Sequence, residues 1–160
     1  ASMIDNLDIQ VSYRTTTGDK PIILIAYDSR VDSFKKITSL FKHICASNLT
    51  PEGLTFEAIK NELVAASGDR ESYFINFSDG MPYCEPKGYQ YYGESAVQHT
   101  RKQVDGMRKK GIKVLSYFIG QNQYGSHDEF TRMYGKSAQS IDVTSLLPLA
   151  KTLNKMFLTK

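Results

Sequence analysis

The stretch Ser72-Tyr-Phe-Ile-Asn-Phe-Ser-Asp-Gly-Met-Pro82 decides the fold of this chain. An aromatic and apolar run ends abruptly in Ser-Asp-Gly, where the backbone must turn. Apolar runs of this length, bounded by turn residues, are typical of strands covered on both faces, as in parallel sheets flanked by helices. Open α/β folds bind their ligands at the carboxyl ends of such strands. Asp79 is therefore the first candidate functional residue, and Thr50, in the loop before the preceding helix, is the second.

Strand-like and helix-like segments alternate along most of the chain. Residues 9–13 and 22–27 are predicted to pair as an antiparallel hairpin. Further strands are expected at 72–77, 112–119 and 138–143, and amphipathic helices at 33–44, 51–66, 94–110, 128–134 and 144–158. This order predicts an α/β fold: a three-layer, Rossmann-like domain with a mostly parallel central sheet, one antiparallel edge strand and helices on both faces.

The composition is that of one domain with a substantial core, because 41% of the 160 residues are hydrophobic and 23% are charged. The net charge of +3 is spread through the sequence. The one basic run, Arg108-Lys109-Lys110, lies in the last turn of a predicted helix, where cations complement the helix dipole. We therefore expect no nucleic-acid partner, and the lack of any run of ~18 to 20 apolar residues predicts no membrane partner.

The two cysteines, Cys45 and Cys84, have no metal-ligand spacing and form no C-x-x-C pair. Free thiols in a reducing compartment are the expected state. Because the start of the chain has no signal-peptide pattern, the expected location is the cytoplasm.

The predicted loop between Gly80 and Gly93 is long and rich in tyrosine. Loops beyond ~12 residues inside a compact domain are uncommon and often functional. The loop follows Asp79 directly, so its tyrosines are expected at the same edge of the sheet, where they either contact a partner protein or only pack as a cover. These residues are Tyr83, Tyr89, Tyr91 and Tyr92.

Three segments carry a resemblance to a known family. Asn48-Leu-Thr-Pro-Glu-Gly-Leu54 leads into a helix, the strand ending Phe77-Ser-Asp-Gly-Met-Pro82 follows, and Ile112-Lys-Val-Leu-Ser-Tyr-Phe-Ile-Gly120 forms the next strand. In this order they resemble the von Willebrand factor A domain, and most of all the intracellular A domains of the cobaltochelatase type, which work with AAA+ ATPases. The resemblance covers nearly the whole chain, including Ser140-Ile-Asp-Val143 and the Leu-rich helix after it.

The resemblance implies a divalent ion, usually Mg²⁺, at the carboxyl edge of the sheet, in a metal-ion-dependent adhesion site. In that family its ligands are an Asp-x-Ser-x-Ser motif, a threonine and an aspartate. By this match Thr50 supplies the threonine and Asp79 the aspartate. Such an ion takes an acidic side chain from a partner protein. The implied function is a non-catalytic protein-protein interaction module, in a cobaltochelatase-like pairing with an AAA+ ATPase.

The chain departs from the family in its first strand. No Asp-x-Ser-x-Ser occurs; Asp28-Ser-Arg-Val-Asp-Ser33 is the nearest match, with Arg30 in place of the first serine. We therefore expect a single domain over residues 1–160 that lacks the family's first strand and most of its first helix. That strand would lie between 9–13 and 72–77. Either a segment outside this sequence fills that position, or the two strands pair directly.

Simpler interpretations remain open for each candidate. Thr50 suits the N-cap of a helix that begins at Pro51, and Asp79 suits an Asp-Gly turn. An alternative function from another class is a metal-dependent phosphohydrolase that uses Asp79 with Glu85. The sequence otherwise has no P-loop, no Gly-x-Gly-x-x-Gly and no Ser-His-Asp arrangement.

Overall fold

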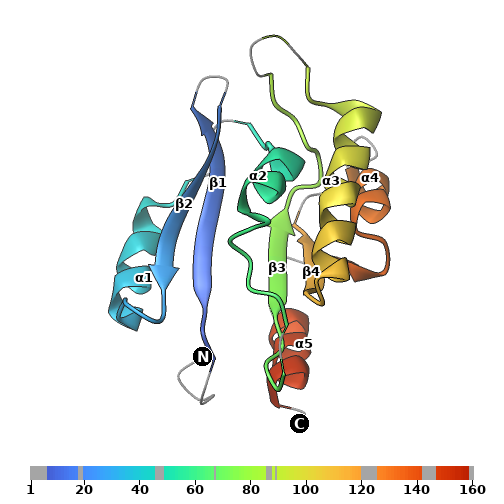
Figure 1. Cartoon of the computed structure of the whole chain (residues 1–160). Helices are drawn as coiled ribbons and strands as arrows, with labels where there is room; N and C mark the ends of the chain where they lie inside the picture. The colour runs from blue at the N-terminus through green and yellow to red at the C-terminus, as the bar shows by residue number, and fades with distance from the viewer. Residues whose placement is uncertain are drawn as a thin grey trace.

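The strands form two separate sheets (Figure 1). A computed structural model describes residues 7–17, 20–45, 49–66, 68–85, 88, 90–119, 126–141 and 147–158. β1 (Gln10–Thr17) and β2 (Lys20–Asp28) pair as an antiparallel hairpin, as predicted. β3 (Tyr73–Ser78), β4 (Lys113–Phe118) and β5 (Ala138–Ser140) form a parallel sheet in that order. The predicted α/β, Rossmann-like class is confirmed, but the described strands do not join into one continuous sheet.

Three helices cover one face of the parallel sheet. These are α2 (Glu52–Ile59), α3 (Gly93–Lys109) and α4 (Ser126–Tyr134). They meet β4 in one apolar cluster, which contains Phe56, Val97, Val104, Met107, Ile112, Val114, Phe118, Phe130, Met133 and Tyr134. The amphipathic pattern predicted for residues 94–110 is confirmed, because one face of α3 is buried, with Val97, Thr100, Val104 and Met107.

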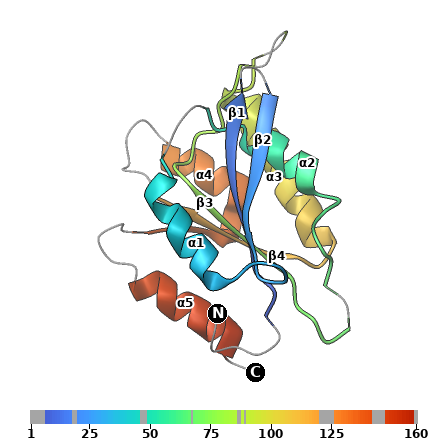
Figure 2. The same cartoon turned by 90° about the vertical axis from the view of Figure 1, so that its left-hand side faces the viewer.

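The remaining helices, α1 and α5, lie on the other side of the strands, α1 beside β2 and α5 below β3 (Figures 1 and 2). α1 (Phe34–Leu40) packs beside β2 and continues into a 3₁₀ turn, Phe41–His43. α5 (Leu147–Leu158) reaches the parallel sheet, where the rings of Phe157 and Tyr73 lie 5.2 Å apart. Residues 142–146, at the predicted end of the last strand and start of the last helix, lie outside the described residues, as do residues 1–6.

The amphipathic helix predicted at 33–44 buries only part of its apolar face. Ile37 is buried, but Phe34 and Phe41 are 66% and 58% exposed. A sheet of two strands offers too little surface to cover a whole helix face, which explains the difference. The second helix is also shorter than predicted: α2 ends at Ile59, and Val64 is 71% exposed.

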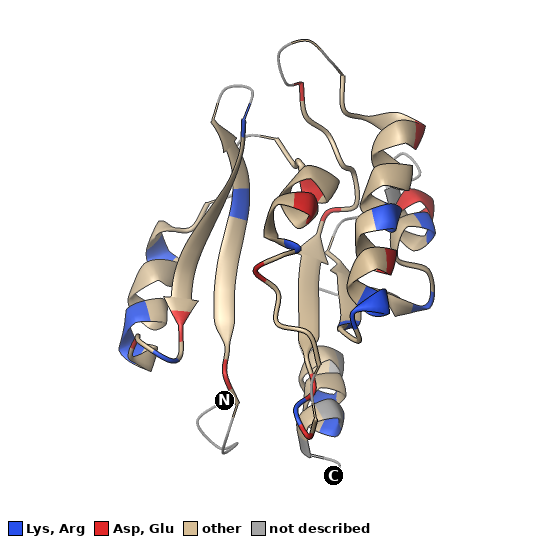
Figure 3. Ribbon diagram, in the orientation of Figure 1, with Lys and Arg blue, Asp and Glu red and all other residues tan. Residues whose placement is uncertain are grey.

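β1 and β3 lie on facing sides of the two sheets and run in the same direction (Figure 1). They are not ladder partners, so the direct pairing considered above does not occur. Arg14 is the only charged residue of β1, and β3 has none (Figure 3). The guanidinium group of Arg14 reaches from β1 to β3, where it donates to the Asn76 Oδ1 atom at 2.6 Å and to the Phe77 carbonyl at 3.2 Å.

Candidate functional site

The predicted site residue Asp79 lies at the carboxyl end of β3, immediately after the last strand residue. Its side chain is exposed. The chain turns at Gly80, which has a φ of 100°, a conformation that favours glycine. The Gly80 N–H donates to the Ser78 hydroxyl at 3.2 Å, which fixes the turn. The prediction that the strand delivers this aspartate to the sheet edge is confirmed.

Thr50 lies at the same edge as the segment that follows Asp79. The Tyr83 N–H donates to the Thr50 carbonyl at 2.9 Å, and the two residues form an isolated antiparallel bridge. The helix-cap interpretation of Thr50 was wrong, because α2 begins at Glu52 after Pro51 and has no side-chain cap. The Thr50 hydroxyl is therefore not used in capping the helix.

Two of the predicted tyrosines form an exposed pair beside this edge. The rings of Tyr83 and Tyr92 are stacked with centroids 5.9 Å apart, and the side chains are 39% and 43% exposed. The Tyr83 hydroxyl donates to Glu85 Oε1 and the Tyr92 hydroxyl to Gln90 Oε1, both at 2.6 Å. The hydrogen bond to Glu85 raises the pKa of Tyr83 above its ordinary value. Tyr89 lies outside the described residues.

The third described tyrosine belongs to the core, so its predicted role as a contact residue was wrong. Tyr91 is 3% exposed, and its main chain exchanges two hydrogen bonds of 2.9 Å with Cys84. Its hydroxyl lies 3.0 Å from His99 Nδ1. α2 packs closely on Tyr91 and α3 at Gly53. A Cβ atom added there would clash with the Tyr91 hydroxyl and would lie 2.9 Å from the Thr100 Cα atom of α3. Tyr91 therefore fixes the loop to α2 and α3.

A buried polar cluster joins β1, α2, β3 and α4 next to the carboxyl edge of β3. The Glu52 side chain, in the first turn of α2, is fully buried and forms an ion pair with Arg14 at 3.0 Å. Glu52 Oε1 also accepts hydrogen bonds from Asn76 Nδ2 at 2.9 Å and from the Tyr134 hydroxyl at 2.5 Å. Glu52 Oε2 lies 3.3 Å from the Ser78 hydroxyl, which donates to it. We call these five residues the Glu52 cluster.

The electrostatics of the Glu52 cluster follow from its burial. A carboxylate without water contact needs charged or hydrogen-bonding partners, and this one has four. Burial first, and then the nearby Glu52 carboxyl, raise the pKa of Tyr134 well above its ordinary value, so the hydroxyl remains a donor. Arg14 Nε is buried and has no hydrogen-bond partner among the described residues.

Sequence reasoning missed this cluster, although one signal was present. Asn76 and Ser78 alternate with apolar residues inside the deciding stretch, so they share one face of β3. A polar pair on the helix-covered face of a strand requires a buried polar partner. Glu52 supplies it and thereby ties α2, and the Thr50 loop before it, to the end of β3.

The donor set at the edge is small. Thr50 and Asp79 offer a hydroxyl and a carboxylate, which are hard oxygen ligands of the kind that Mg²⁺ prefers. Across the part of the chain that the structure describes, no three His, Cys, Asp or Glu side chains converge in a way that could hold a metal ion. The chemistry of the two side chains suits Mg²⁺, but two ligands would fill only part of its coordination shell.

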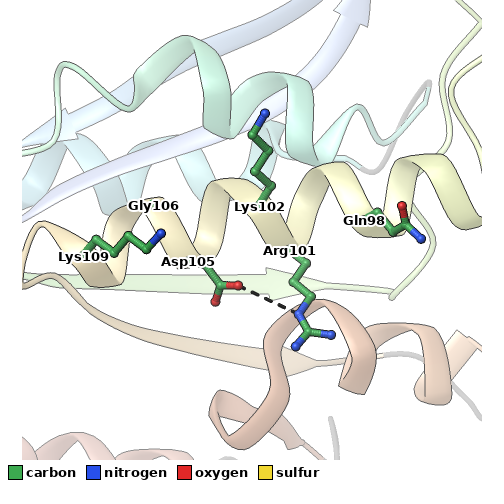
Figure 4. Close-up of a pocket in the computed structure, with 6 residues that line it drawn as sticks. All are labelled: Gln98, Arg101, Lys102, Asp105, Gly106 and Lys109. Carbon is green, nitrogen blue, oxygen red and sulfur yellow. Dashed lines mark ion pairs between the residues drawn. The ribbon is translucent and has the colours of Figure 1, made fainter.

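A shallow hollow on the outer face of α3 has a different character (Figure 4). Its volume is about 460 Å³, and all of its lining residues come from this helix. Arg101 and Asp105 form an i,i+4 ion pair of 3.9 Å there. Nearby, Arg108 of the basic run donates to the Tyr134 carbonyl and to Ser137, and Lys110 donates to the Lys60 carbonyl. The hollow is therefore a solvated helix face. Two cations of the basic run, Arg108 and Lys110, bind main-chain carbonyls of neighbouring segments.

No helix among the described residues combines the length and the apolar character that a membrane span requires. Comparison of the chain with protein-family models and with curated proteins found no match.

Proposed function

We propose that this chain is a non-catalytic protein-protein interaction module of the von Willebrand A type. Its contact surface is the carboxyl edge of the parallel sheet, formed by Thr50, Asp79, Tyr83 and Tyr92. The observation that carries the proposal is the 2.9 Å bond between the Tyr83 N–H and the Thr50 carbonyl. This bond holds the loop before α2 against the loop after β3, so the two predicted ligands and the tyrosine pair share one edge.

The character of that edge supports a protein partner. Asp79 is exposed, and the stacked pair of Tyr83 and Tyr92 adds a rigid aromatic surface next to it. Tyrosine is enriched in protein interfaces, because it supplies contact area at a low entropy cost. The sequence resemblance favours an AAA+ ATPase as the partner.

In this proposal a divalent cation, Mg²⁺, joins the edge to an acidic residue of the partner. The Thr50 hydroxyl and the Asp79 carboxylate would hold the ion, and Mg²⁺ supplies a positive charge that attracts a carboxylate. Mg²⁺ is commonly bound by one or two carboxylates and keeps several waters. Two protein ligands are therefore compatible with a weak site that the partner completes.

Calorimetric titration with MgCl₂ tests the metal ligand. We expect the wild-type chain and the Asp69→Ala variant to bind Mg²⁺ alike, and the Asp79→Ala variant to lose the binding. Asp69 is a matched control because it is exposed and precedes β3, at the opposite end of the strand. Equal binding by Asp79→Ala and wild type, or no binding by wild type, contradicts the metal assignment.

A second titration tests the acidic partner residue. A blocked Gly-Glu-Gly peptide is added to the chain with and without Mg²⁺, and a blocked Gly-Gln-Gly peptide serves as its neutral control. Binding of the glutamate peptide alone, and only with Mg²⁺ present, is the expected result. Equal binding of both peptides contradicts recognition of a carboxylate.

A further inference from the structure

The extended segment that follows β3 presents every second side chain to solvent. Pro82 and Cys84 are buried, whereas Tyr83 and Glu85 are exposed. Two isolated antiparallel bridges hold the main chain of this segment, one to the loop before α2 and one to the residues just before α3. The fold therefore fixes the direction in which the side chains of Tyr83 and Glu85 point.

Tyr92 extends this exposed side into a rigid aromatic surface. Its ring stacks on the ring of Tyr83, with the centroids 5.9 Å apart and an angle of 22° between the planes. Each hydroxyl donates to a side-chain oxygen at 2.6 Å, the Tyr83 hydroxyl to Glu85 and the Tyr92 hydroxyl to Gln90. The rings are thus held by the stack and by their hydroxyls, yet they remain 39% and 43% exposed to a ligand.

The charge beside the two rings is negative. Glu85 accepts the Tyr83 hydroxyl at Oε1 and forms no ion pair with any residue that the structure describes. Between Asp79 and Tyr92 the described residues include two acidic side chains, those of Asp79 and Glu85, and no basic one. The face of an aromatic ring is itself negative, because its π electrons lie above and below the ring plane. A carboxylate beside two exposed rings therefore attracts a cation and repels an anion.

We propose that Tyr83, Tyr92 and Glu85 bind an arginine side chain of the partner protein. Its guanidinium group stacks on the exposed tyrosine surface and donates to the second carboxylate oxygen of Glu85. Arginine suits this surface better than lysine, because a guanidinium group is planar, is weakly hydrated and carries several N–H donors. The inference rests on the proposed function, in which this edge contacts a protein, but it requires neither Thr50, Asp79 nor Mg²⁺.

An NMR titration of the full chain in buffer with EDTA tests this inference. The probe is a blocked Gly-Arg-Gly peptide, and its control is a blocked Gly-citrulline-Gly peptide, whose side chain ends in a planar but neutral group. We expect the arginine peptide to shift the ring signals of Tyr83 and Tyr92 and to bind more tightly than the citrulline peptide. Because the surface is exposed, about 0.5 M NaCl should weaken the binding.

Four variants separate the parts of the site. Glu85→Gln and Tyr92→Leu should each weaken binding of the arginine peptide roughly two- to fivefold, through loss of the ion pair and of the cation–π contact respectively. Tyr92→Phe keeps the ring face and should bind the peptide as the wild type does. Asp69→Asn is the matched control for charge, because it removes one exposed acidic group at the opposite end of β3 and should have no effect.

Equal binding of the two peptides overturns the proposal, and so does an equal effect of Glu85→Gln and Asp69→Asn. Lys87 is a basic residue of the same loop and lies outside the described residues. Stronger peptide binding by Lys87→Gln would identify Lys87 as the cation on this surface and would also overturn the proposal. Since the buffer contains no free Mg²⁺, a failed arginine titration and a failed MgCl₂ titration are separate results.

Discussion

Glu52 is fully buried, and its position shows how one carboxyl group can hold three parts of the molecule together. It is bonded to Arg14 on β1, to Asn76 and Ser78 on β3 and to Tyr134 on α4. Each partner is far away in sequence; Tyr134 is separated from it by 82 positions. Removing this side chain should therefore loosen both sheets and the edge above them.

The Glu52→Ala variant should lose about 3 kcal/mol of unfolding free energy, because it leaves Arg14 and Asn76 without their shared acceptor. The Glu57→Ala variant is the matched control, since Glu57 lies on the same helix, is 49% exposed and forms ion pairs with Lys60 at 3.5 Å and with His99 at 3.4 Å. Its change should stay within about 0.5 kcal/mol. Urea unfolding measures both, and equal losses would contradict a special role for Glu52.

Tyr134 gives the fold a dependence on alkaline pH. Its pKa is raised in the folded state, so the neutral hydroxyl is the form that the fold favours. The resulting stability is complete below the ordinary tyrosine pKa of about 10 and is lost as the pH rises through the higher folded value. The stability difference between wild type and Tyr134→Phe should therefore shrink between about pH 8 and about pH 11. Urea unfolding at the two pH values measures it, and a constant difference would disprove the assignment.

The sequence pattern identified the candidate site residue Asp79 but not the buried Glu52 cluster beside it. Asp79 followed from an apolar run that stops at a turn, and that signal is local. The polar residues Asn76 and Ser78 were visible inside the same run, but their partners come from β1, α2 and α4. Local periodicity carries no information about which distant carboxyl group meets a strand face.

The loop between β3 and α3 contains tyrosines of two kinds. Tyr83 and Tyr92 are exposed, so the double variant Tyr83→Ser/Tyr92→Ser should change the unfolding free energy by less than about 1 kcal/mol. Tyr91 is buried against α3, so Tyr91→Ser should cost about 3 kcal/mol or more. Thermal unfolding distinguishes them. Should the double variant melt as early as Tyr91→Ser, the exposed pair is part of the core cover and its contact role is wrong.

Sequence periodicity located the helices and strands but overestimated two helices. The pattern at 51–66 predicts one long helix, yet α2 ends at Ile59, where the burial of the apolar stripe decreases. The pattern at 33–44 is likewise amphipathic, but much of its apolar face is exposed because the two-stranded sheet does not extend over it. Periodicity reports which residues can form a helix face, whereas packing determines how much of that face is used.

At the scale of the whole molecule, the alternation of strands and helices was enough to predict the α/β class and a mostly parallel sheet, which β3, β4 and β5 form. The division of the described strands into two sheets was not predicted, because no periodic pattern specifies which strands pair. A two-stranded hairpin is marginally stable in isolation. The hairpin β1–β2 therefore depends on its contacts with α1 and α2 and on the bonds of Arg14.

The close approach at Gly53 constrains how this sequence can evolve. Any larger residue there would push α2 away from Thr100 on α3 and would carry the Thr50 loop with it. At Gly106 on α3, by contrast, an added Cβ atom would meet no other atom within 4 Å. If the edge has the proposed function, selection for it would act strongly on this glycine, although Gly53 itself is no part of the contact surface. Thr50 and Asp79 can therefore vary without disturbing the packing of α2 on α3, whereas Gly53 cannot.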